Sequence, residues 1–465
     1  MSESEARVQS ASEAITPTAL VQDIYAGVKS PEDQKKITDM KDFYEKNDGV
    51  VVGEIEQLRT EVGSIEGWKQ TKEKAKQELE SVPPDVLERI LKQFAPFIKN
   101  LPAGHSRGHF LRDTSYLSLI MHDTSVSNND PVEIFVGLLG GMYHDIGNSV
   151  VDRYQEAKRF SGHAEIGAHL FGEVSKGLIG DNLRKLAQLT IAGHTHYLKD
   201  RTVVKGQETR TVKPYEDEVV DGNRIAFWWT RQSDRMDAQG PIMDVRHMVT
   251  KAEPTEDFDG KEFHATWDNP NDDFKHQFTP RLRTNDERTK EPKPKNTMNV
   301  LEHVTMFADS NFNPDLPYAK HDNQLYKEMV SKAADEQKEF VNAAATGAPQ
   351  LTPEARDAAF RRYFRMVRTI EPADNTDDAI HKMMDKFKLL SEEEQDKWAG
   401  AFDILTRKLY PQMHKRIKGV LDAPIVKINE RGQTGAARVQ DILDNHLQVL
   451  GREIWNQFEP SKLAA

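Results

Sequence analysis

His144 and Asp145 end an apolar run, GLLGGMYHDIGN, and this pair constrains the fold more than any other feature of the chain. An imidazole nitrogen and a carboxylate oxygen at adjacent positions can bind one metal ion. Successive residues on a helix point about 100° apart, so both side chains can reach one ion only near a helix end. The pair therefore predicts a metal site at a helix terminus, to which other segments must add ligands.

Candidate ligands occur in order on both sides of this pair. They are His109 upstream and His163, His194 and Asp234 downstream. The chain has 16 histidines and no cysteine, which excludes disulfides, thiolate ligands and cysteine nucleophiles. A metal ion would therefore be bound by imidazole nitrogen and carboxylate oxygen, held by rigid elements around a position open to water.

Helical periodicity dominates the segment from Leu111 to Leu198. Apolar stretches follow one another there and are separated by Gly, Asn, Ser or Asp, and Asp130-Pro131 is a typical helix start. Between residues 199 and 223 the stretch RTVVKGQETRTV instead alternates charge with Thr and Val, which favours a small β-hairpin. We predict an all-α fold, a helical bundle with a small β-hairpin insertion and flanking helical segments.

Breaks in the pattern divide the 465 residues into four parts. Residues 1–82 are expected to form a mobile lead-in, with a helical segment from about Val52. Pro83-Pro84 opens the metal-binding helical domain, which extends over 83–250. A polar stretch, 251–298, has little periodicity and is expected to be a loop or linker. Residues 299–465 return to helices and form a C-terminal helical domain.

Charge and hydropathy limit the partners of the protein. A net charge of −12 argues against a surface that binds nucleic acid. The first residues lack the apolar core of a signal peptide, and no run is apolar enough to span a bilayer. We expect a cytoplasmic protein with a small-molecule substrate and no membrane association. If the protein forms a homo-oligomer, we expect the flanking helices to make the contact.

The ligand-bearing segments together resemble the HD-domain superfamily of metal-dependent phosphohydrolases. The resemblance lies in the order H-x-x-R, HDIG, H-x-E-I-G-A, I-A-G-H and S-D-R-M-D-A, over roughly residues 100–245. It implies a helical bundle with metal ions at its centre. It also implies hydrolysis of a phosphomonoester or phosphodiester, of the nucleotide type, by metal-activated water.

Carried over residue by residue, the resemblance implies roles for each ligand candidate. His109, His144, Asp145 and Asp234 match the family's core ligands, and His163 and His194 match further histidines of its two-metal members. Two divalent transition-metal ions are therefore expected, with Asp145 between them; Mn, Fe, Zn, Co and Ni all remain open.

Three residues are expected to take part in the chemical step, two of them also as metal ligands. Asp145, Arg112 and His163 are the expected catalytic residues, with Arg112 neutralising charge on the phosphoryl group. Lys199 and Arg231 are weaker candidates for the same task.

Several nearby residues compete with these assignments. His196 could replace His194, and Asp237, one helical turn after Asp234, could replace that residue. His105 could be a ligand, a substrate contact or a helix-start residue, and we favour the last. His122-Asp123 and His169 are expected to be structural, since no family segment aligns with them. Trp228-Trp229 is expected to pack in the core.

Departures from the family pattern leave alternatives. Asn148 follows HDIG where cyclic-dinucleotide hydrolases have lysine, His194 and His196 are not adjacent, and no G-Y-P tripeptide occurs, so cyclic di-GMP specificity is unsupported. A minority of the superfamily are di-iron oxygenases with a similar ligand set. A non-catalytic nucleotide-binding or scaffold protein that retains the fold is the third hypothesis.

Overall fold

The computed structural model describes residues 17–122, 130–151, 156–194, 201–205, 208–212, 224–252, 324–347, 350–423, 428 and 432–464, and this part of the chain is mainly helical. The first helices are α1 (Pro17–Ala26), α2 (Pro31–Val62), α3 (Ile65–Ser81), α4 (Val86–Lys99), α5 (Arg107–Met121), α6 (Pro131–Tyr143), a 3-10 turn η2 (Ile146–Ser149), α7 (Glu156–Val174) and α8 (Asp181–Ala192). After them come α10 (Ile225–Asp237), α11 (Gly240–Ala252), α15 (Gln324–Thr346), α16 (Pro353–Ile370), α17 (Thr376–Leu389), α18 (Glu392–Ile404), α19 (Tyr410–Leu421), α20 (Ala436–Ile442), α21 (Gln448–Gln457) and α22 (Ser461–Ala464). Short π-helical turns, Leu405–Leu409 and Leu443–Leu447, precede α19 and α21.

The N-terminal region contains more helix than the sequence predicted. The second helix begins at Pro31 and not near Val52, because Ser30 forms a capping box. Its hydroxyl accepts from the Asp33 backbone N–H at 3.1 Å, and the Asp33 carboxylate accepts from the Ser30 N–H at 3.1 Å. The expectation of a mobile lead-in is therefore wrong for residues 31–51, and residues 1–16 lie outside the described part.

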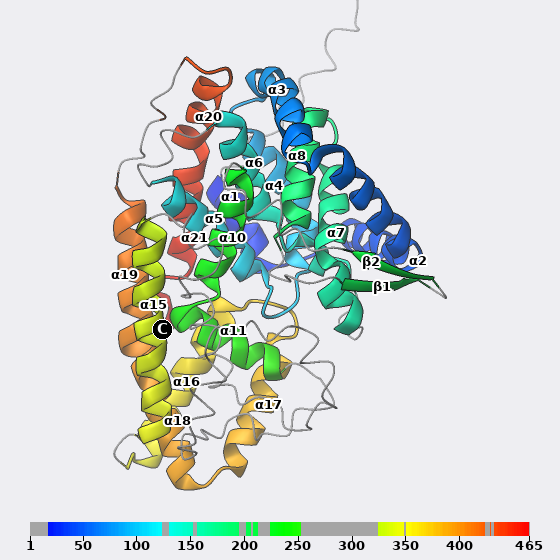
Figure 1. Cartoon of the computed structure of the whole chain (residues 1–465). Helices are drawn as coiled ribbons and strands as arrows, with labels where there is room; N and C mark the ends of the chain where they lie inside the picture. The colour runs from blue at the N-terminus through cyan, green and yellow to red at the C-terminus, as the bar shows by residue number, and fades with distance from the viewer. Residues whose placement is uncertain are drawn as a thin grey trace, which may run out of the picture.

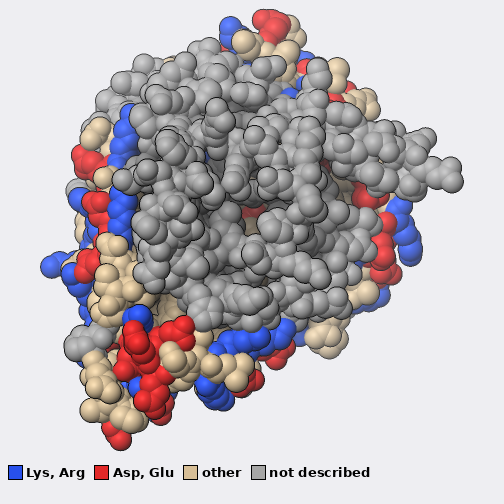
Figure 2. All heavy atoms as spheres, turned by 60° about the horizontal axis from the view of Figure 1, so that its bottom comes forward, with Lys and Arg blue, Asp and Glu red and all other residues tan. Residues whose placement is uncertain are grey.

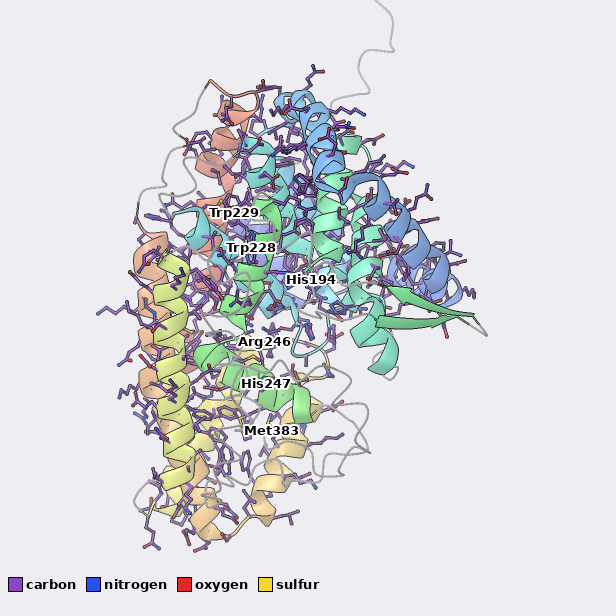
Figure 3. All side chains as sticks on the ribbon, viewed as in Figure 1. His194, Trp228, Trp229, Arg246, His247 and Met383 are labelled. Carbon is purple, nitrogen blue, oxygen red and sulfur yellow. The ribbon has the colours of Figure 1, made fainter. Side chains whose placement is uncertain are left out.

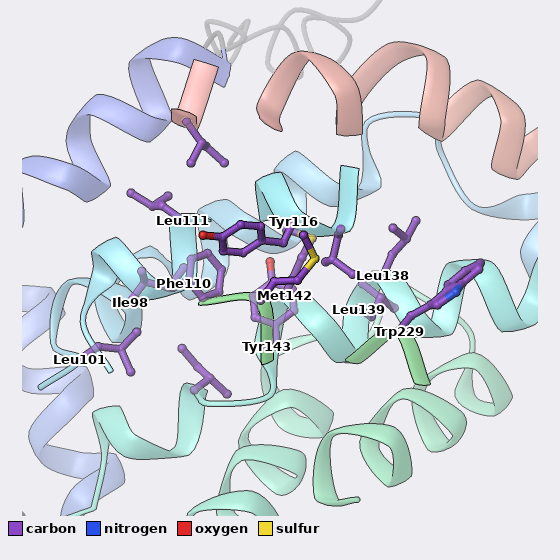
Figure 4. Close-up of a cluster of buried hydrophobic side chains, with 14 of the residues drawn as sticks. Ile98, Leu101, Phe110, Leu111, Tyr116, Leu138, Leu139, Met142, Tyr143 and Trp229 are labelled. Atoms are coloured by element: carbon purple, nitrogen blue, oxygen red, sulfur yellow. The ribbon is translucent and has the colours of Figure 1, made fainter. Parts of the chain in front are cut away.

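An aromatic and aliphatic core fixes the end of α6, where the His-Asp pair lies. Tyr143 is fully buried and packs against Phe94 at 4.5 Å and Phe110 at 5.5 Å between ring centroids. Figure 4 shows this cluster, in which α4, α5 and α6 meet, with Trp229 of α10 beside α6. Rotation of α6 would expose these rings, so the packing sets the direction in which His144 points.

Glu133, in the first turn of α6, joins three helices at the end opposite the His-Asp pair. Its buried carboxylate accepts from the Trp68 indole at 2.5 Å and from the Ala226 backbone N–H at 3.2 Å. Lys72 lies 3.2 Å from the same carboxylate and neutralises its charge. The helices α3, α6 and α10 are thereby held in one arrangement.

The C-terminal helices pack directly on α5, the helix that carries His109. The Ser115 hydroxyl donates to the Gly451 carbonyl at 3.0 Å, and the Ser118 hydroxyl donates to the Leu447 carbonyl at 2.8 Å. A Cβ at Gly451 would collide with Ser118, so glycine is needed for this close approach. In Figure 1, α21 runs beside α5, while α15, α16, α18 and α19 lie together in the lower half of the view.

Two short strands depart from the helical pattern. β1 (Arg201–Lys205) and β2 (Glu208–Val212) pair antiparallel, with Arg201 opposite Val212 and Lys205 opposite Glu208. They project to one side of the molecule near α2 and α7 (Figure 1). The expected linker, 251–298, falls outside the described residues apart from its first two positions.

The described surface carries both signs of charge. Figure 2 shows acidic side chains gathered at one corner of the face, with basic side chains beside them. No described helix is both long and apolar enough to cross a membrane.

Asp244 on α11 is a fully buried carboxyl group outside the candidate site. Burial raises its pKa well above the usual range; Gln337 lowers the pKa and Glu336 raises it further. A folded-state pKa above the unfolded value means that this group stabilises the fold most below about pH 4, and that this contribution is lost as the pH rises. We expect Asp244→Asn to raise the free energy of unfolding at pH 7.5 by about 1–2 kcal/mol. Urea denaturation at pH 7.5 and 4.5 checks this, and a variant less stable than the wild type at pH 7.5 would contradict it.

Candidate metal centre

Five segments converge to bring all six predicted ligands together. His109 lies in the first turn of α5, His144 follows the last residue of α6, and Asp145 precedes η2. The other three come from α7, from the end of α8 and from α10. His163 lies inside α7, which begins at Glu156.

Glycines allow the His-Asp turn to touch α7. A Cβ at Gly147 would collide with the His163 carbonyl oxygen, and a Cβ at Gly167 would lie 3.0 Å from the Gly147 nitrogen. On the other side, a Cβ at Gly140 would collide with Thr230 and Thr190. The helices therefore approach closely enough for short side chains to share one site, as Gly140 and Gly167 led us to expect.

The first group of donor atoms surrounds the His109 and His144 Nε2 atoms. His109 Nε2 lies 3.2 Å from Asp145 Oδ2 and 3.9 Å from Asp234 Oδ1. His144 Nε2 lies 3.6 Å from each of the same two oxygens. Two atoms that bind one ion at about 2.1 Å lie about 3.0 Å apart at a right angle and about 3.4 Å apart at the tetrahedral angle. The observed separations, 3.2 to 3.9 Å, lie between the right-angle value and the limit of about 4.2 Å for two atoms on opposite sides of one ion.

A second group lies at the other oxygen of Asp145. Asp145 Oδ1 is 3.5 Å from His163 Nε2 and 3.4 Å from His194 Nε2. These two nitrogens are 3.2 Å apart. The two oxygens of Asp145 therefore face different pairs of imidazoles, which is the arrangement expected of a carboxylate between two ions.

Backbone and carboxylate acceptors fix the orientation of three imidazoles. His109 Nδ1 contacts Asp237 Oδ2 at 2.7 Å, His144 Nδ1 contacts the Gly141 carbonyl at 2.9 Å, and His194 Nδ1 contacts the Ile191 carbonyl at 2.7 Å. These acceptors require the proton on Nδ1, which in the neutral ring leaves a lone pair on Nε2. All three Nε2 atoms face the site.

Unpaired polar atoms indicate that a cation fits there. The Nε2 atoms of His109 and His144 are buried and have no hydrogen-bond partner in the described structure. Leaving such groups unsatisfied is costly unless a ligand pairs with them. Imidazole nitrogen with carboxylate oxygen is the donor set that suits divalent transition metals. The buried His/Asp groups could therefore hold a metal ion.

Carboxylates dominate the electrostatics of the site. Burial and Arg246 lower the pKa of His109, but Asp113, Asp145 and Asp237 together raise it to about 9. Burial lowers the pKa of His144 too, and its carboxylate neighbours raise it to about 10.

The carboxyl groups of the site respond to burial in opposite ways. Burial raises the pKa of Asp145, yet His105 and His144 bring it well below its usual range. For Asp113 burial wins, and its pKa rises to about 7 despite His109 and His144. The ionised carboxylates of the site therefore favour a positive charge, a proton or a cation, beside the imidazoles.

Arg112 does not face the site, contrary to the prediction that it contacts a phosphate. Its guanidinium is fully buried and donates to both oxygens of Asp237, at 2.6 and 2.8 Å. It also donates to the Ile370 carbonyl at 2.7 Å and lies 3.3 Å from Glu371. The helical spacing from His109 was right, but the side chain points into the core.

Arg231, the weaker cation candidate among the described residues, also points to an interior acceptor. Arg231 is buried and donates to the Gly193 carbonyl at 2.9 and 3.2 Å. Lys199 and the ligand alternative His196 lie outside the described residues.

Asp234 and Asp237, the two alternatives for the last ligand, lie on different sides of the His109 ring. Asp234 Oδ1 faces both Nε2 atoms, whereas Asp237 contacts the Nδ1 side of His109. Asp237 is in turn held by Arg112 and by Arg246, whose Nη1 lies 3.1 Å away. Asp237 therefore orients His109 from behind.

The C-terminal region completes this supporting network. Glu371, which follows α16, accepts from the Gly104 backbone N–H at 2.9 Å and pairs with Arg112. Figure 3 shows Arg246 on α11, below His194 in the view, with Trp228 and Trp229 above it on α10. Both tryptophans are buried, as core packing predicts.

Two residues of the site were not assigned from the sequence. His105 was interpreted as a helix-start residue, yet its Nδ1 lies 2.6 Å from Asp145 Oδ2. Asp113 was overlooked, although it lies one helical turn after His109 and its Oδ2 is 3.4 Å from His109 Nε2. Their spacing of four residues from His109 was the signal that could have revealed both.

His169 and His122, which were expected to be structural, lie outside the candidate ligand set. His169 contacts the Tyr44 hydroxyl at 3.0 Å and Glu54 at 3.3 Å, away from the site. His122 ends α5, as expected, and Asp123 lies outside the described residues.

No protein-family model matches the chain, and comparisons with curated proteins and with solved structures found no match. The resemblance to the HD-domain superfamily therefore stays a prediction.

Asp237→Asn should weaken metal binding through His109, because the variant loses the charge that fixes the ring. We expect the affinity for a divalent ion to fall about 10–100-fold, as for other residues that orient a ligand. Loss of the buried carboxylate charge beside Arg112 and Arg246 should also cost about 3–5 kcal/mol of stability. Titration with a competing chelator measures the affinity.

Glu371→Gln is the matched control for this variant. It removes a carboxylate from the same arginine but does not contact His109. It should lower the unfolding midpoint and leave the metal affinity within about twofold, whereas equal losses of affinity in both variants would contradict the role given to Asp237.

Proposed function

We propose that the protein is an HD-type metal-dependent phosphohydrolase that cleaves a phosphomonoester or phosphodiester of a nucleotide-like small molecule. The observation that carries the proposal is the placement of Asp145, whose two oxygens face two separate pairs of imidazole Nε2 atoms. A site of this kind holds two divalent ions. Such ions, when bound, supply Lewis acidity and lower the pKa of a water molecule.

The chain's own residues would bind and orient these ions. One ion would be held by His109, His144 and Asp234 on one side of Asp145. The other would be held by His163 and His194 on the opposite side. Hydrogen bonds at Nδ1 keep the rings of His109, His144 and His194 turned with Nε2 toward the site. Asn148 donates to Asp145 Oδ1 at 3.1 Å and limits rotation of the shared carboxylate.

Exposure indicates the side from which a substrate would enter. The side chains of His109 and His144 are 0% and 1% exposed, whereas those of His105 and Asp234 are 28% and 17% exposed. His105 and Asp234 therefore border the open side of the site. His105, in contact with Asp145 Oδ2, is placed to hold or move a proton there.

A di-iron oxygenase is the second candidate. The observation in its favour is that Arg112 and Arg231, the described arginines expected to contact phosphate, are both committed to interior acceptors. Oxygen consumption by iron-loaded protein with an organic substrate would favour this candidate. Metal-dependent phosphate release from a phosphoester panel would favour the hydrolase.

Asp145→Ala tests the proposed function directly. Loss of the shared carboxylate should remove both ions and lower phosphoester hydrolysis by at least about 1,000-fold, since a two-metal site is lost. Elemental analysis of the purified protein is measured beside the activity. Full metal content and full activity in this variant would show that the assignment is wrong.

His169→Gln is the control, because His169 shares α7 with His163 but contacts Tyr44 and Glu54. It should keep wild-type metal content and activity. Wild-type protein without bound metal but with intact nucleotide binding would instead support a scaffold role.

A further inference from the structure

Asp113 is a buried carboxylate at the candidate metal centre that the ligand pattern does not include. It lies on α5, one turn after His109, and is 0% exposed. Neither of its oxygens has a hydrogen-bond partner in the described structure. A buried carboxylate in this condition costs several kcal/mol unless a cation or a proton accompanies it.

The immediate neighbours of Asp113 are two ligand nitrogens. Asp113 Oδ2 lies 3.4 Å from His109 Nε2 and 3.5 Å from His144 Nε2. Both rings have their Nδ1 atoms against acceptors, so in the neutral rings the Nε2 atoms carry lone pairs. A carboxylate oxygen and two lone-pair nitrogens repel one another, and a shared cation would turn this repulsion into attraction.

We propose that Asp113 Oδ2 is a direct ligand of the ion held by His109 and His144. The inference rests on the proposed two-metal centre and adds one ligand to it. With Asp145 Oδ2 and Asp234 Oδ1, the ion then has three carboxylate oxygens and two imidazole nitrogens from the protein.

This donor set narrows the metal identity, which the sequence left open. Zinc in proteins favours few ligands in a tetrahedral shell, whereas oxygen-rich, higher-coordinate sites suit Mn²⁺ and also accept Fe²⁺. The ion at His109 and His144 is therefore inferred to be a five- or six-coordinate Mn²⁺ or Fe²⁺. The ion at His163 and His194 has no equivalent of Asp113 among its described neighbours.

Asp113→Asn tests this role, because the amide matches the carboxylate in shape and lacks its charge. The matched control is Asp244→Asn, which changes an equally buried carboxyl group with no hydrogen-bond partner, outside the site. Full-length protein is stripped with a chelator and titrated with MnCl₂, and free Mn²⁺ is followed by electron paramagnetic resonance.

We expect wild type and Asp244→Asn to bind two Mn²⁺ with the same affinities. Asp113→Asn should lose about tenfold to hundredfold in affinity for one of the two. Wild-type affinity for both ions in Asp113→Asn would overturn the role of Asp113 and leave the proposed function standing. Wild-type protein that binds no divalent ion would overturn the proposed function itself.

A second measurement uses the wild type alone, in case Asp113→Asn does not fold. Protein loaded with one equivalent of Co²⁺ should show the weak visible absorption of a five- or six-coordinate ion. The strong absorption of tetrahedral Co²⁺ at both sites, after a second equivalent, would overturn the inference.

Discussion

The buried ion pair between Arg112 and Asp237 is the interaction on which the candidate site depends. The Asp237 carboxylate accepts hydrogen bonds from Nε and Nη2 of Arg112. It also contacts His109 Nδ1 and pairs with Arg246. Burial raises the pKa of Asp237, but Arg112 above all lowers it well below the usual range, so the group is ionised at any physiological pH. A carboxylate that is always charged can hold the His109 proton on Nδ1 and keep Nε2 directed at the site. The pair joins α5 to α10, and Arg246 adds α11, so the site and the packing of these helices depend on the Asp237 carboxylate.

The concentration of carboxylates has a cost that a cation would offset. Without cations the carboxylates favour protons on His109 and His144, whose pKa values rise to about 9 and 10. A divalent ion must displace such protons before the Nε2 atoms can bind it. Glycines at 140, 147 and 167 make the crowding feasible, because they bring the helices close enough for short side chains to share one cavity in the core. The fold therefore brings carboxylates together at a buried place, where a proton or a cation must accompany them.

Local sequence pattern was enough to predict which residues come together at the candidate site, and insufficient to predict the residues that support them. His109, His144, His163, His194 and Asp234 each lie at or near a helical segment with a clear signal, and the order of the segments identified them. Helical spacing placed Arg112 near His109 but could not tell whether its guanidinium points to the site or to the core. Glu371 and Arg246 both contact Gly104, from which they are separated by 267 and 142 residues in the sequence. Helical periodicity cannot predict contacts over such distances along the chain. Ser30, whose capping box begins α2, was a local signal that the polar composition of the first residues concealed.

The helices after residue 323 belong to the same physical unit as the candidate site. Glu371 fixes Gly104 and Arg112, Ile370 accepts from Arg112, and the helix from Gln448 covers α5 through Ser115 and Ser118. Removing these helices would leave the Arg112 guanidinium without two of its acceptors and would expose the apolar face of α5. The resemblance covers only about residues 100–245, so a boundary drawn from it would cut through the network that orients His109. What the motif identifies is thus a set of candidate ligands, and the structure that holds these side chains extends through most of the described chain.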